Sequence, residues 1–216
     1  MKETKRLIIF NIGIILIIII AGFACYYFYN QSSLYLKTDD AQVTGQQIII
    51  SSPAAGKLVS WNGTAGTNFS SGETVGQVQV SNGNATEKIN IPIPQNGSIV
   101  QNNATSNEYV GPGTPLAYAY DMNNLTVTAN IEETQIQDVK IGNTVDVYVD
   151  AFPGSHVTGT VSSIGLTTAS TFSMMPSQST NANFTKVTQV IPVTIDLKAV
   201  PDGLVPGMNV TVRIHK

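Results

Sequence analysis

Hydrophobic and polar residues follow two different patterns along the chain. Residues 7–29, LIIFNIGIILIIIIAGFACYYFY, form an apolar run without a single charge, and a helix of this length spans a hydrocarbon core of roughly 30 Å. Beyond residue 40, apolar and polar positions alternate in short stretches separated by Gly, Pro and Asn, which is typical of β-strands. The pattern predicts one N-terminal transmembrane helix followed by a mainly β protein.

The residues before the apolar run predict its orientation. Three of them are basic: Lys2, Lys5 and Arg6. The positive-inside rule therefore places residues 1–6 in the cytoplasm and residues 31–216 outside the cell membrane. A cleaved signal peptide is one alternative, although its apolar region is normally shorter, at about 7–15 residues. Acylation of Cys25, within the sequence GFAC, is another. We expect a single-pass protein of the cell membrane.

An internal repeat occupies the first half of the β region. Residues 48–78 align with residues 89–119 at a constant offset of 41 positions and without a gap, which indicates duplicated structure. The copies share three pairs of turn-forming residues: Pro53 and Pro94, Gly56 and Gly97, Gly72 and Gly113. We expect each glycine to provide a positive φ in a tight turn. Because such short strands cannot bury a face alone, the copies should pack as a flattened sandwich over residues 38–122, joined by a short connection at 79–88.

The second half of the β region, residues 123–216, has the pattern of a small barrel. Alternating apolar residues predict strands at 125–131, 144–149, 187–197 and 208–214. The segment EETQIQDVKIG begins with two acidic residues and ends with Lys140 and Gly142, an order that favours one short helix at 132–141. Several short strands with one helix, closed by Gly and Pro turns, predict a β-barrel domain.

Several segments resemble a known family. The doubled pattern P-x-x-G-x-(V/I)…G-x-x-(V/L) resembles the half-motifs of a biotinyl/lipoyl-type domain, and its place behind an anchor is similar to that in membrane fusion proteins of the HlyD type. TDDAQVTGQQIII at 38–50 resembles the opening of the EmrA-like multidrug adaptors. VTANIEETQIQDVKIGNTVDVYVDAFP at 127–153 and GLVPGMNVTVRI at 203–214 resemble the first and last parts of their barrel. FSMMPSQSTNANFTKVTQVIPVTIDL at 172–197 is the most specific match.

The resemblance implies a lipoyl-like barrel-sandwich hybrid, a β-barrel domain and an adaptor without enzymatic activity. It implies that the adaptor joins an integral-membrane exporter and forms a homo-oligomeric ring. In the EmrA-like branch the implied exporter is of the major-facilitator type, with an ABC exporter as the alternative. Asp39 and Asp40 would mark the junction of the lipoyl-like and barrel domains. A cell-surface binding or structural module with the same fold is the alternative from a different class.

The connection between the repeat copies departs from this family. Related adaptors usually carry a long α-helical hairpin there, but only QVSNGNATEK separates the copies here. Ten residues cannot form two helices and a connection, and Asn82-Gly83 favours a turn. We expect a plain hairpin or loop, and therefore a protein that cannot reach a second membrane by itself. This favours a cell with one membrane, either a monoderm bacterium or an archaeon.

Composition limits the partners. Only 12% of the residues are Asp, Glu, Lys or Arg and the net charge is −3, which gives no electrostatic reason to expect nucleic acid. Nine Asn-X-Ser/Thr triplets are more than this composition produces by chance, and they begin at Asn30, Asn62, Asn68, Asn84, Asn96, Asn103, Asn124, Asn183 and Asn209. Surface glycosylation and turns in an Asn- and Thr-rich chain explain them equally well.

No residue pattern indicates catalysis, a metal or a cofactor. Lys88 lies between the repeat copies, where a lipoyl or biotinyl carrier has its modified lysine, but its neighbours Glu87 and Ile89 do not match a carrier tip. His156 and His215 have no partner at metal-ligand spacing. We expect Lys88 and both histidines to be surface residues of a protein that is not an enzyme.

Residues 171–185, TFSMMPSQSTNANFT, interrupt the strand alternation. Four apolar residues stand among Ser, Thr, Asn and Gln: Phe172, Met174, Met175 and Phe184. They either fold back onto the barrel or form a contact for a transporter or the outer leaflet, because exposed Met and Phe make adaptable interfaces. These four are the candidate transporter-contact residues.

Overall fold

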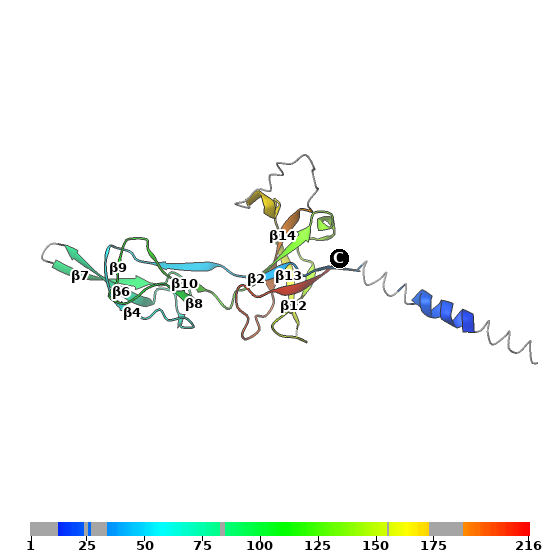
Figure 1. Ribbon diagram of the computed structural model, residues 1–216, viewed down its shortest axis with the longest axis horizontal. Helices are drawn as coiled ribbons and strands as arrows, with labels where there is room; N and C mark the ends of the chain where they lie inside the picture. Colours follow the sequence, from blue (N-terminus) through cyan, green and yellow to red (C-terminus); the bar gives the residue numbers. More distant parts are fainter. Residues whose placement is uncertain (1–12, 24–25, 27–33, 83–84, 155, 173–187) are drawn as a thin grey trace, which may run out of the picture.

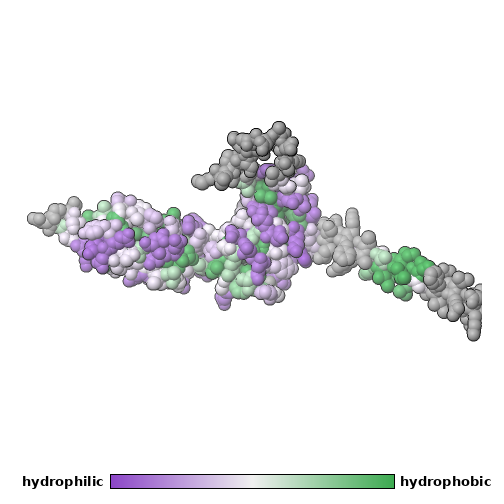
Figure 2. Space-filling view, in the orientation of Figure 1, coloured by the Kyte–Doolittle hydropathy of each residue, from purple (hydrophilic) through white to green (hydrophobic). Residues whose placement is uncertain are grey.

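The computed structural model describes residues 13–23, 26, 34–82, 85–154, 156–172 and 188–216. Residues 13–23 are helical, and Figure 1 shows a barrel between this segment and a flattened sandwich. Apolar side chains cover the helical segment, whereas polar residues cover most of the visible face of the two β units (Figure 2). Among the described residues no helix is both long and apolar enough to cross a bilayer. Apart from Tyr26, the remainder of the predicted 7–29 span lies outside them.

The sandwich consists of two four-stranded sheets around one apolar core, so the mainly β fold is confirmed. One sheet has the order β3-β10-β8-β5: Gln47–Ser51, Pro115–Tyr120, Gly97–Asn102 and Asn68–Phe69. The other has the order β7-β6-β4-β9: Ala85–Pro92, Thr74–Asn82, Gly56–Trp61 and Tyr109–Val110. Large side chains of both sheets meet in the core and are at most 1% exposed, among them Ile50, Leu58, Ile91 and Ile99.

The 41-residue repeat corresponds directly to this architecture. Adding 41 to the bounds of β4 and β5 gives the bounds of β8 and β9. Every strand of one sheet has its repeat counterpart at the same place in the other sheet, and each sheet contains two strands from each copy. The copies therefore interleave instead of forming one sheet each, and neither copy can complete a sheet by itself.

The conserved spacing of glycines in the two copies has two different physical causes. Gly72 and Gly113 have φ angles of 81° and 77°, in the left-handed region that glycine tolerates. The same expectation for Gly56 and Gly97 is wrong, because neither has a positive φ. A Cβ on Gly56 would lie 2.2 Å from the carbonyl oxygen of Gln79, and one on Gly97 would lie 3.0 Å from a backbone oxygen of β10. Close packing of neighbouring strands, and not turn geometry, requires these two glycines.

A β-hairpin joins the two copies. Strand β6 continues to Asn82 and β7 begins at Ala85, and these two residues are the last pair of the ladder. Strand pairing thus includes most of the connection expected at 79–88. The absence of a long helical hairpin from this connection is confirmed, and the β-hairpin forms the end of the sandwich farthest from the barrel (Figure 1).

The barrel is one antiparallel sheet with the strand order β1-β15-β12-β13-β14-β11-β2. In that order its strands are Tyr35–Thr38, Val210–His215, Thr144–Val149, His156–Ile164, Val190–Leu197, Thr126–Glu132 and Ala41–Thr44. The sheet closes because β1 and β2 follow each other in the chain, while β1 pairs with β15 at one edge and β2 with β11 at the other. The predicted alternation is confirmed in β12, where Val145, Val147 and Val149 point into the core.

The sandwich is an insertion between two paired barrel strands. Thr44 at the end of β2 lies opposite Thr126 at the start of β11, and all of β3–β10 lies between them in sequence. The expected domain boundary at residue 38 is therefore corrected, because residues 35–44 form strands of the barrel. Sequence periodicity could not show this, since it does not reveal which distant strand a short segment pairs with.

Asp39 and Asp40 lie within the barrel, at the point where the chain stops pairing with β15 and starts pairing with β11. The Asp40 carbonyl accepts a hydrogen bond of 2.8 Å from the Asn130 amide, and the Thr38 hydroxyl donates one of 3.1 Å to the Asn130 carbonyl. The expected position at the junction of the two domains is thus corrected, because strand β2 lies between these residues and the junction. The pair marks the seam that closes the barrel.

The short helix expected at 132–141 is confirmed as a single 3₁₀ turn, η1 (Ile136–Asp138). It ends early because Val139 has extended backbone angles and is buried in the barrel core. A second 3₁₀ turn, η2 (Ala169–Phe172), follows β13 and was not predicted.

Candidate functional site

The sandwich and the barrel meet at a joint of two short linkers. Residues 45–46 connect β2 to β3, and residues 121–125 connect β10 to β11. Asp121 holds the second linker in a turn: its carboxylate accepts a 3.0 Å hydrogen bond from the Asn123 amide, and its carbonyl accepts one of 3.2 Å from the Asn124 amide. Both linkers are therefore short, and the second has a defined conformation.

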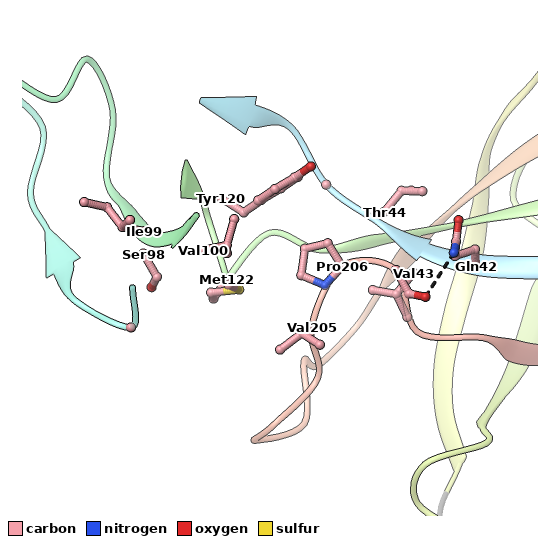
Figure 3. Close-up of a pocket in the computed structure, with 13 residues that line it drawn as sticks. Gln42, Val43, Thr44, Ser98, Ile99, Val100, Tyr120, Met122, Val205 and Pro206 are labelled. Atoms are coloured by element: carbon pink, nitrogen blue, oxygen red, sulfur yellow. Dashed lines mark hydrogen bonds between the residues drawn. The ribbon is translucent and has the colours of Figure 1, made fainter. Parts of the chain in front are cut away.

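An apolar groove of about 660 Å³ opens beside this joint. Figure 3 shows that its walls come from both units, with Val100, Tyr120 and Met122 on one side and Val205 and Pro206 on the other. No charged residue lines it, and Val100 and Val205 are 38% and 42% exposed. The groove is thus suited to an uncharged, apolar surface rather than to an ion.

Two hydrogen bonds between β2 and Gly207 fix the barrel side of the groove. The Gln42 side-chain amide donates to the Gly207 carbonyl at 3.0 Å, and the Gly207 amide donates to the Val43 carbonyl at 2.8 Å. The loop that carries Val205 and Pro206 is therefore attached to β2.

A second hollow beside β2 is polar. Its lining includes Asp39, Asp40 and Asp150. Within the part of the chain that the structure describes, no group of three or more His, Cys, Asp or Glu side chains is placed to hold a metal ion.

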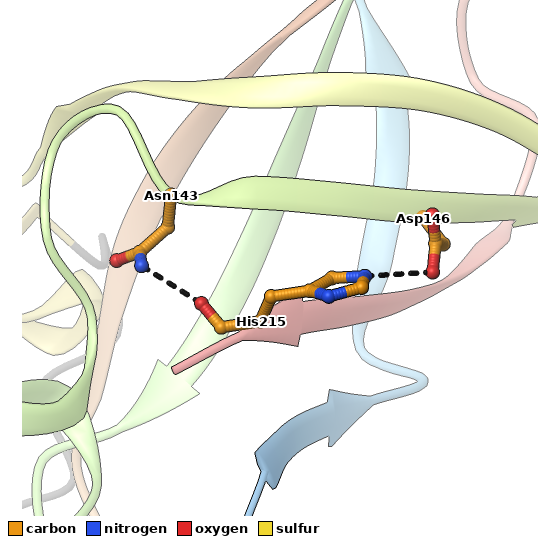
Figure 4. Close-up of polar contacts among 3 residues, drawn as sticks. All are labelled: Asn143, Asp146 and His215. Atoms are coloured by element: carbon orange, nitrogen blue, oxygen red, sulfur yellow. Dashed lines mark hydrogen bonds and ion pairs between the residues drawn. The ribbon is translucent and has the colours of Figure 1, made fainter.

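His215, the last residue of β15, belongs to a network on the outer surface of the barrel (Figure 4). Its Nε2 lies 2.9 Å from Asp146 Oδ2, and its carbonyl accepts a 2.8 Å hydrogen bond from the Asn143 side chain. Its ring meets the Tyr35 ring edge-on, with 4.8 Å between centroids. These contacts join β1, β15 and β12, which gives His215 a structural role.

The remaining candidates from the sequence lie apart from the groove. Lys88 is exposed within strand β7, whereas a carrier lysine stands at the tip of its hairpin. His156 is exposed, with its ring centroid 5.6 Å from that of Tyr148. Pro53 and Pro94 lie in the bends that precede β4 and β8.

The candidate transporter-contact residues are mostly outside the described residues. Phe172 ends η2, whereas Met174, Met175 and Phe184 belong to the segment 173–187, which the structure does not describe. Both interpretations of this loop stay predictions.

The groove itself was not predicted. Its residues come from β2 and the linker after it, the turn before β5, strand β8, the end of β10 with the linker after it, and the loop before β15. They meet only because the sandwich is inserted into the barrel. The one local signal is LVPG at 204–207, where two apolar residues stand in a turn. Such a signal alone does not identify a groove.

Comparison with known proteins identifies the family. Residues 47–121 match the family described as YhbJ, barrel-sandwich hybrid domain, and residues 125–214 match the YknX-like beta-barrel domain. The chain is 42% identical over 211 residues to the protein named as efflux system component YhbJ of Bacillus subtilis (strain 168), covering 98% of this chain and 93% of that protein. The chain belongs to the YhbJ-like membrane fusion proteins. The resemblance to HlyD-type, EmrA-like adaptors is thereby confirmed, and the family is one of adaptors and not of enzymes.

Other relatives of this membrane fusion protein match over shorter stretches. The colistin resistance protein EmrA of Acinetobacter baumannii is 39% identical over 107 residues, and the multidrug export protein EmrA of Escherichia coli (strain K12) is 35% identical over 115 residues. These matches cover 49% and 52% of this chain but only 30% and 29% of the EmrA proteins.

Solved structures of other proteins share the fold. ZneB from Cupriavidus metallidurans matches with a TM-score of 0.60 and 16% identity, over 84% of this chain and 98% of that chain. The membrane fusion protein Spr0693 from Streptococcus pneumoniae R6 matches with a TM-score of 0.57 and 12% identity, over 85% and 99%. At these identities the likeness shows the fold alone.

Proposed function

We propose that this membrane fusion protein is the anchored, extracytoplasmic adaptor of an export system, and that its partner is an integral-membrane exporter of the major-facilitator type. Its similarity to an efflux system component over nearly its whole length carries this proposal. Relatives named for multidrug export and colistin resistance support a drug exporter as the partner. The adaptor makes and breaks no bond; it assembles into a homo-oligomeric ring that extends the exit path of the exporter.

The anchor is residues 7–29, with residues 1–6 in the cytoplasm and the β units outside. The uncharged sequence and the helical, exposed residues 13–23 support this arrangement. The Lys216 amide donates a 3.0 Å hydrogen bond to the Leu34 carbonyl, so the barrel is tied at the edge where the chain arrives from the anchor. An anchor here holds the barrel, and not the sandwich, next to an exporter in the same bilayer.

Exchange of the anchor tests the proposal. Replacing residues 1–30 by a cleavable secretion signal should release a folded protein and abolish most drug resistance in a strain that lacks the native gene. Replacement by an unrelated single-pass anchor of equal length is the matched control and should retain resistance. Full resistance with the secreted form would contradict a membrane-bound adaptor.

Co-purification of the full chain distinguishes the partners. A major-facilitator exporter should accompany it in mild detergent. If an ABC exporter co-purifies instead, the adaptor proposal stands but the proposed type of exporter is wrong. If no exporter co-purifies, the result favours a cell-surface module with this fold.

The loop with Phe172, Met174, Met175 and Phe184 is the proposed contact with the exporter. Met174→Asp combined with Met175→Asp should reduce the co-purified exporter, because two charges would be buried in an apolar contact. Ser177→Asp with Ser179→Asp adds the same charge in the same loop and should have little effect. If the two variants co-purify equal amounts of exporter, the loop is not the contact and belongs to the barrel surface.

We further propose that this adaptor functions in a cell with one membrane. The short β-hairpin supports this proposal, because it stands where related adaptors have a long helical hairpin. Drug resistance that disappears on deletion of an outer-membrane channel would contradict this part of the proposal.

A further inference from the structure

The two outer faces of the sandwich carry different side chains at equivalent positions. Because the sheets are related by the 41-residue repeat, each outward residue of one sheet has a counterpart in the other. Three outward residues of the β3-β10-β8-β5 sheet are apolar or aromatic: Ile49, Tyr118 and Tyr120. Their counterparts in the β7-β6-β4-β9 sheet are polar amides: Asn90, Gln77 and Gln79.

Charge follows the same division. The strands β3, β10, β8 and β5 contain no charged residue. The other sheet carries Lys57 and Lys88 in one outward row, on either side of Gln79. Since backbone fold and inner-face burial are alike in the two sheets, folding does not require this difference.

On the polar face side-chain amides hydrogen-bond one another, whereas the opposite face exposes an apolar side chain. The Gln77 side chain donates a 2.9 Å hydrogen bond to the Asn90 side chain across β6 and β7. On the opposite face Ile49 is 52% exposed. That face continues through Val100 and Tyr120 into the groove at the joint. The result is one uncharged surface from the sandwich to the barrel, which indicates a binding surface.

We propose that the two faces form one interface between successive copies of this chain, with the β3-β10-β8-β5 face of one copy covering the β7-β6-β4-β9 face of the next. The inference rests on the proposed ring. Both sheets bury their inner sides in one core, so their outer faces point in opposite directions. Such a head-to-tail contact uses two different surfaces of each copy, and it closes into a ring if the rotation between copies allows.

The chemistry of the two faces is complementary. Lys57 and Lys88 can place ammonium groups over the rings of Tyr118 and Tyr120 of the neighbouring copy, a contact worth about 0.5–1 kcal/mol at exposed sites. Gln77 and Gln79 can hydrogen-bond the tyrosine hydroxyls, which need a partner when they are covered. Two apolar faces in contact would leave both lysine faces in water and would form a closed pair, not a ring.

The size of the faces makes the contact weak in dilute solution. A four-stranded face is about 15 Å wide and about 20 Å long, whereas a stable interface buries about 800 Å² on each partner. Copies confined to the same membrane have a high effective concentration, which compensates for a small contact area. Assembly should therefore be tested with full chains in a membrane.

Cysteine crosslinking tests the arrangement. In full chains with Cys25→Ser, Tyr118→Cys is placed in one tagged copy and Gln77→Cys in a differently tagged copy of the same membrane, and a short bismaleimide is added. Crosslinks between the two tags are expected. Crosslinks only between two Tyr118→Cys copies, or none from either cysteine, would overturn the inference. Tyr118→Cys with Leu166→Cys, on the fully exposed barrel loop, is the control and should not crosslink.

A charge substitution gives a second readout. Tyr118→Lys should reduce crosslinking of a separate pair, Ile49→Cys with Gln79→Cys, at least about tenfold, because it brings a cation towards Lys57 and Lys88. Ser163→Lys, on exposed barrel surface, adds the same charge and should not change it. Unchanged crosslinking of a folded Tyr118→Lys chain would overturn the inference. Exporter that still co-purifies with this variant shows that the adaptor function stands independently of the interface.

Discussion

The sandwich and the barrel are built from similar short strands, but they depend on the chain in opposite ways. The sandwich comes from one continuous segment, 47–120, whereas the barrel comes from two segments, 35–44 and 126–215, which the sandwich separates. If the insertion of about 80 residues were unfolded, closing the β2–β11 ladder around it would cost about 4 kcal/mol of loop entropy. The folded sandwich removes this cost because it holds the ends of the loop together. The barrel therefore depends on the sandwich more than the sandwich depends on the barrel.

The strongest test of this comparison is Gly56→Ala. Its Cβ would lie 2.2 Å from a backbone oxygen of β6, so the two strands must separate, and we expect a loss of more than about 3 kcal/mol. Hydrogen exchange of the full chain should show reduced protection in both units. Gly72→Ala is the control: it meets no atom within 4 Å but has a φ of 81°, and it should cost only about 1–2 kcal/mol. Equal losses would show that packing of β4 on β6 does not limit stability.

Truncation of core side chains should have the next largest effect, and it should affect the stability of the sandwich and of the barrel differently. Ile91→Ala in the sandwich and Ile195→Ala in the barrel both remove fully buried side chains, and each should cost about 2–5 kcal/mol. Denaturation followed by peptide-resolved exchange should show Ile91→Ala weakening both units but Ile195→Ala weakening only the barrel. The reverse asymmetry would contradict the dependence inferred from the insertion.

Excision of the sandwich should have a smaller effect on the barrel. Thr44 and Thr126 are direct partners, so a tight Asn-Gly turn in place of residues 45–125 should convert β2 and β11 into a hairpin. We expect barrel stability within about 1–2 kcal/mol of the full chain, with the loss of Leu125 from the core included. A flexible linker of 40 residues at the same place should cost about 3 kcal/mol more than the turn. Equal stability with both linkers would remove the loop-entropy argument.

The smallest effect should come from the barrel surface. Asp138→Asn removes a 2.8 Å ion pair with Lys216 whose carboxylate is half exposed, and such pairs contribute about 0.5 kcal/mol or less. Asp146→Asn removes the charged partner of His215. The Asp146 side chain is more buried than that of Asp138, so this substitution should cost about 1 kcal/mol. Denaturant midpoints of the two variants measure the order, and a larger effect from Asp138→Asn would contradict it.

Sequence reasoning succeeded where structure follows from local spacing. The repeat offset predicted two equivalent sets of strands, and alternation predicted the inward valines of β12. It failed where distant segments decide the outcome. Nothing in TDDAQVT shows that residues 35–44 pair with β15 and β11, because strand pairing is not local. Gly56 and Gly97 were predicted in tight turns but begin strands β4 and β8, since close contact with a neighbouring strand leaves no mark on the sequence beyond the glycine itself.

The functional features divide in the same way. Five segments, none of them unusual alone, form the groove at the joint. The contrast between Ile49, Tyr118 and their amide counterparts was already present in the aligned repeat, but only the sheet order shows which residues face outward. Surface chemistry could be interpreted after the strands were placed, and not before.

The interleaving of the two copies also has a consequence for the assembly of the fold. A gene encoding one copy would produce a chain with two strands for each of two sheets, and it would be complete only when a second such chain supplied the rest. The present sandwich therefore has the arrangement of an intertwined homodimer whose two subunits are joined between β6 and β7. A chain cut between these two strands should accordingly behave as two complementary fragments that fold together and not apart.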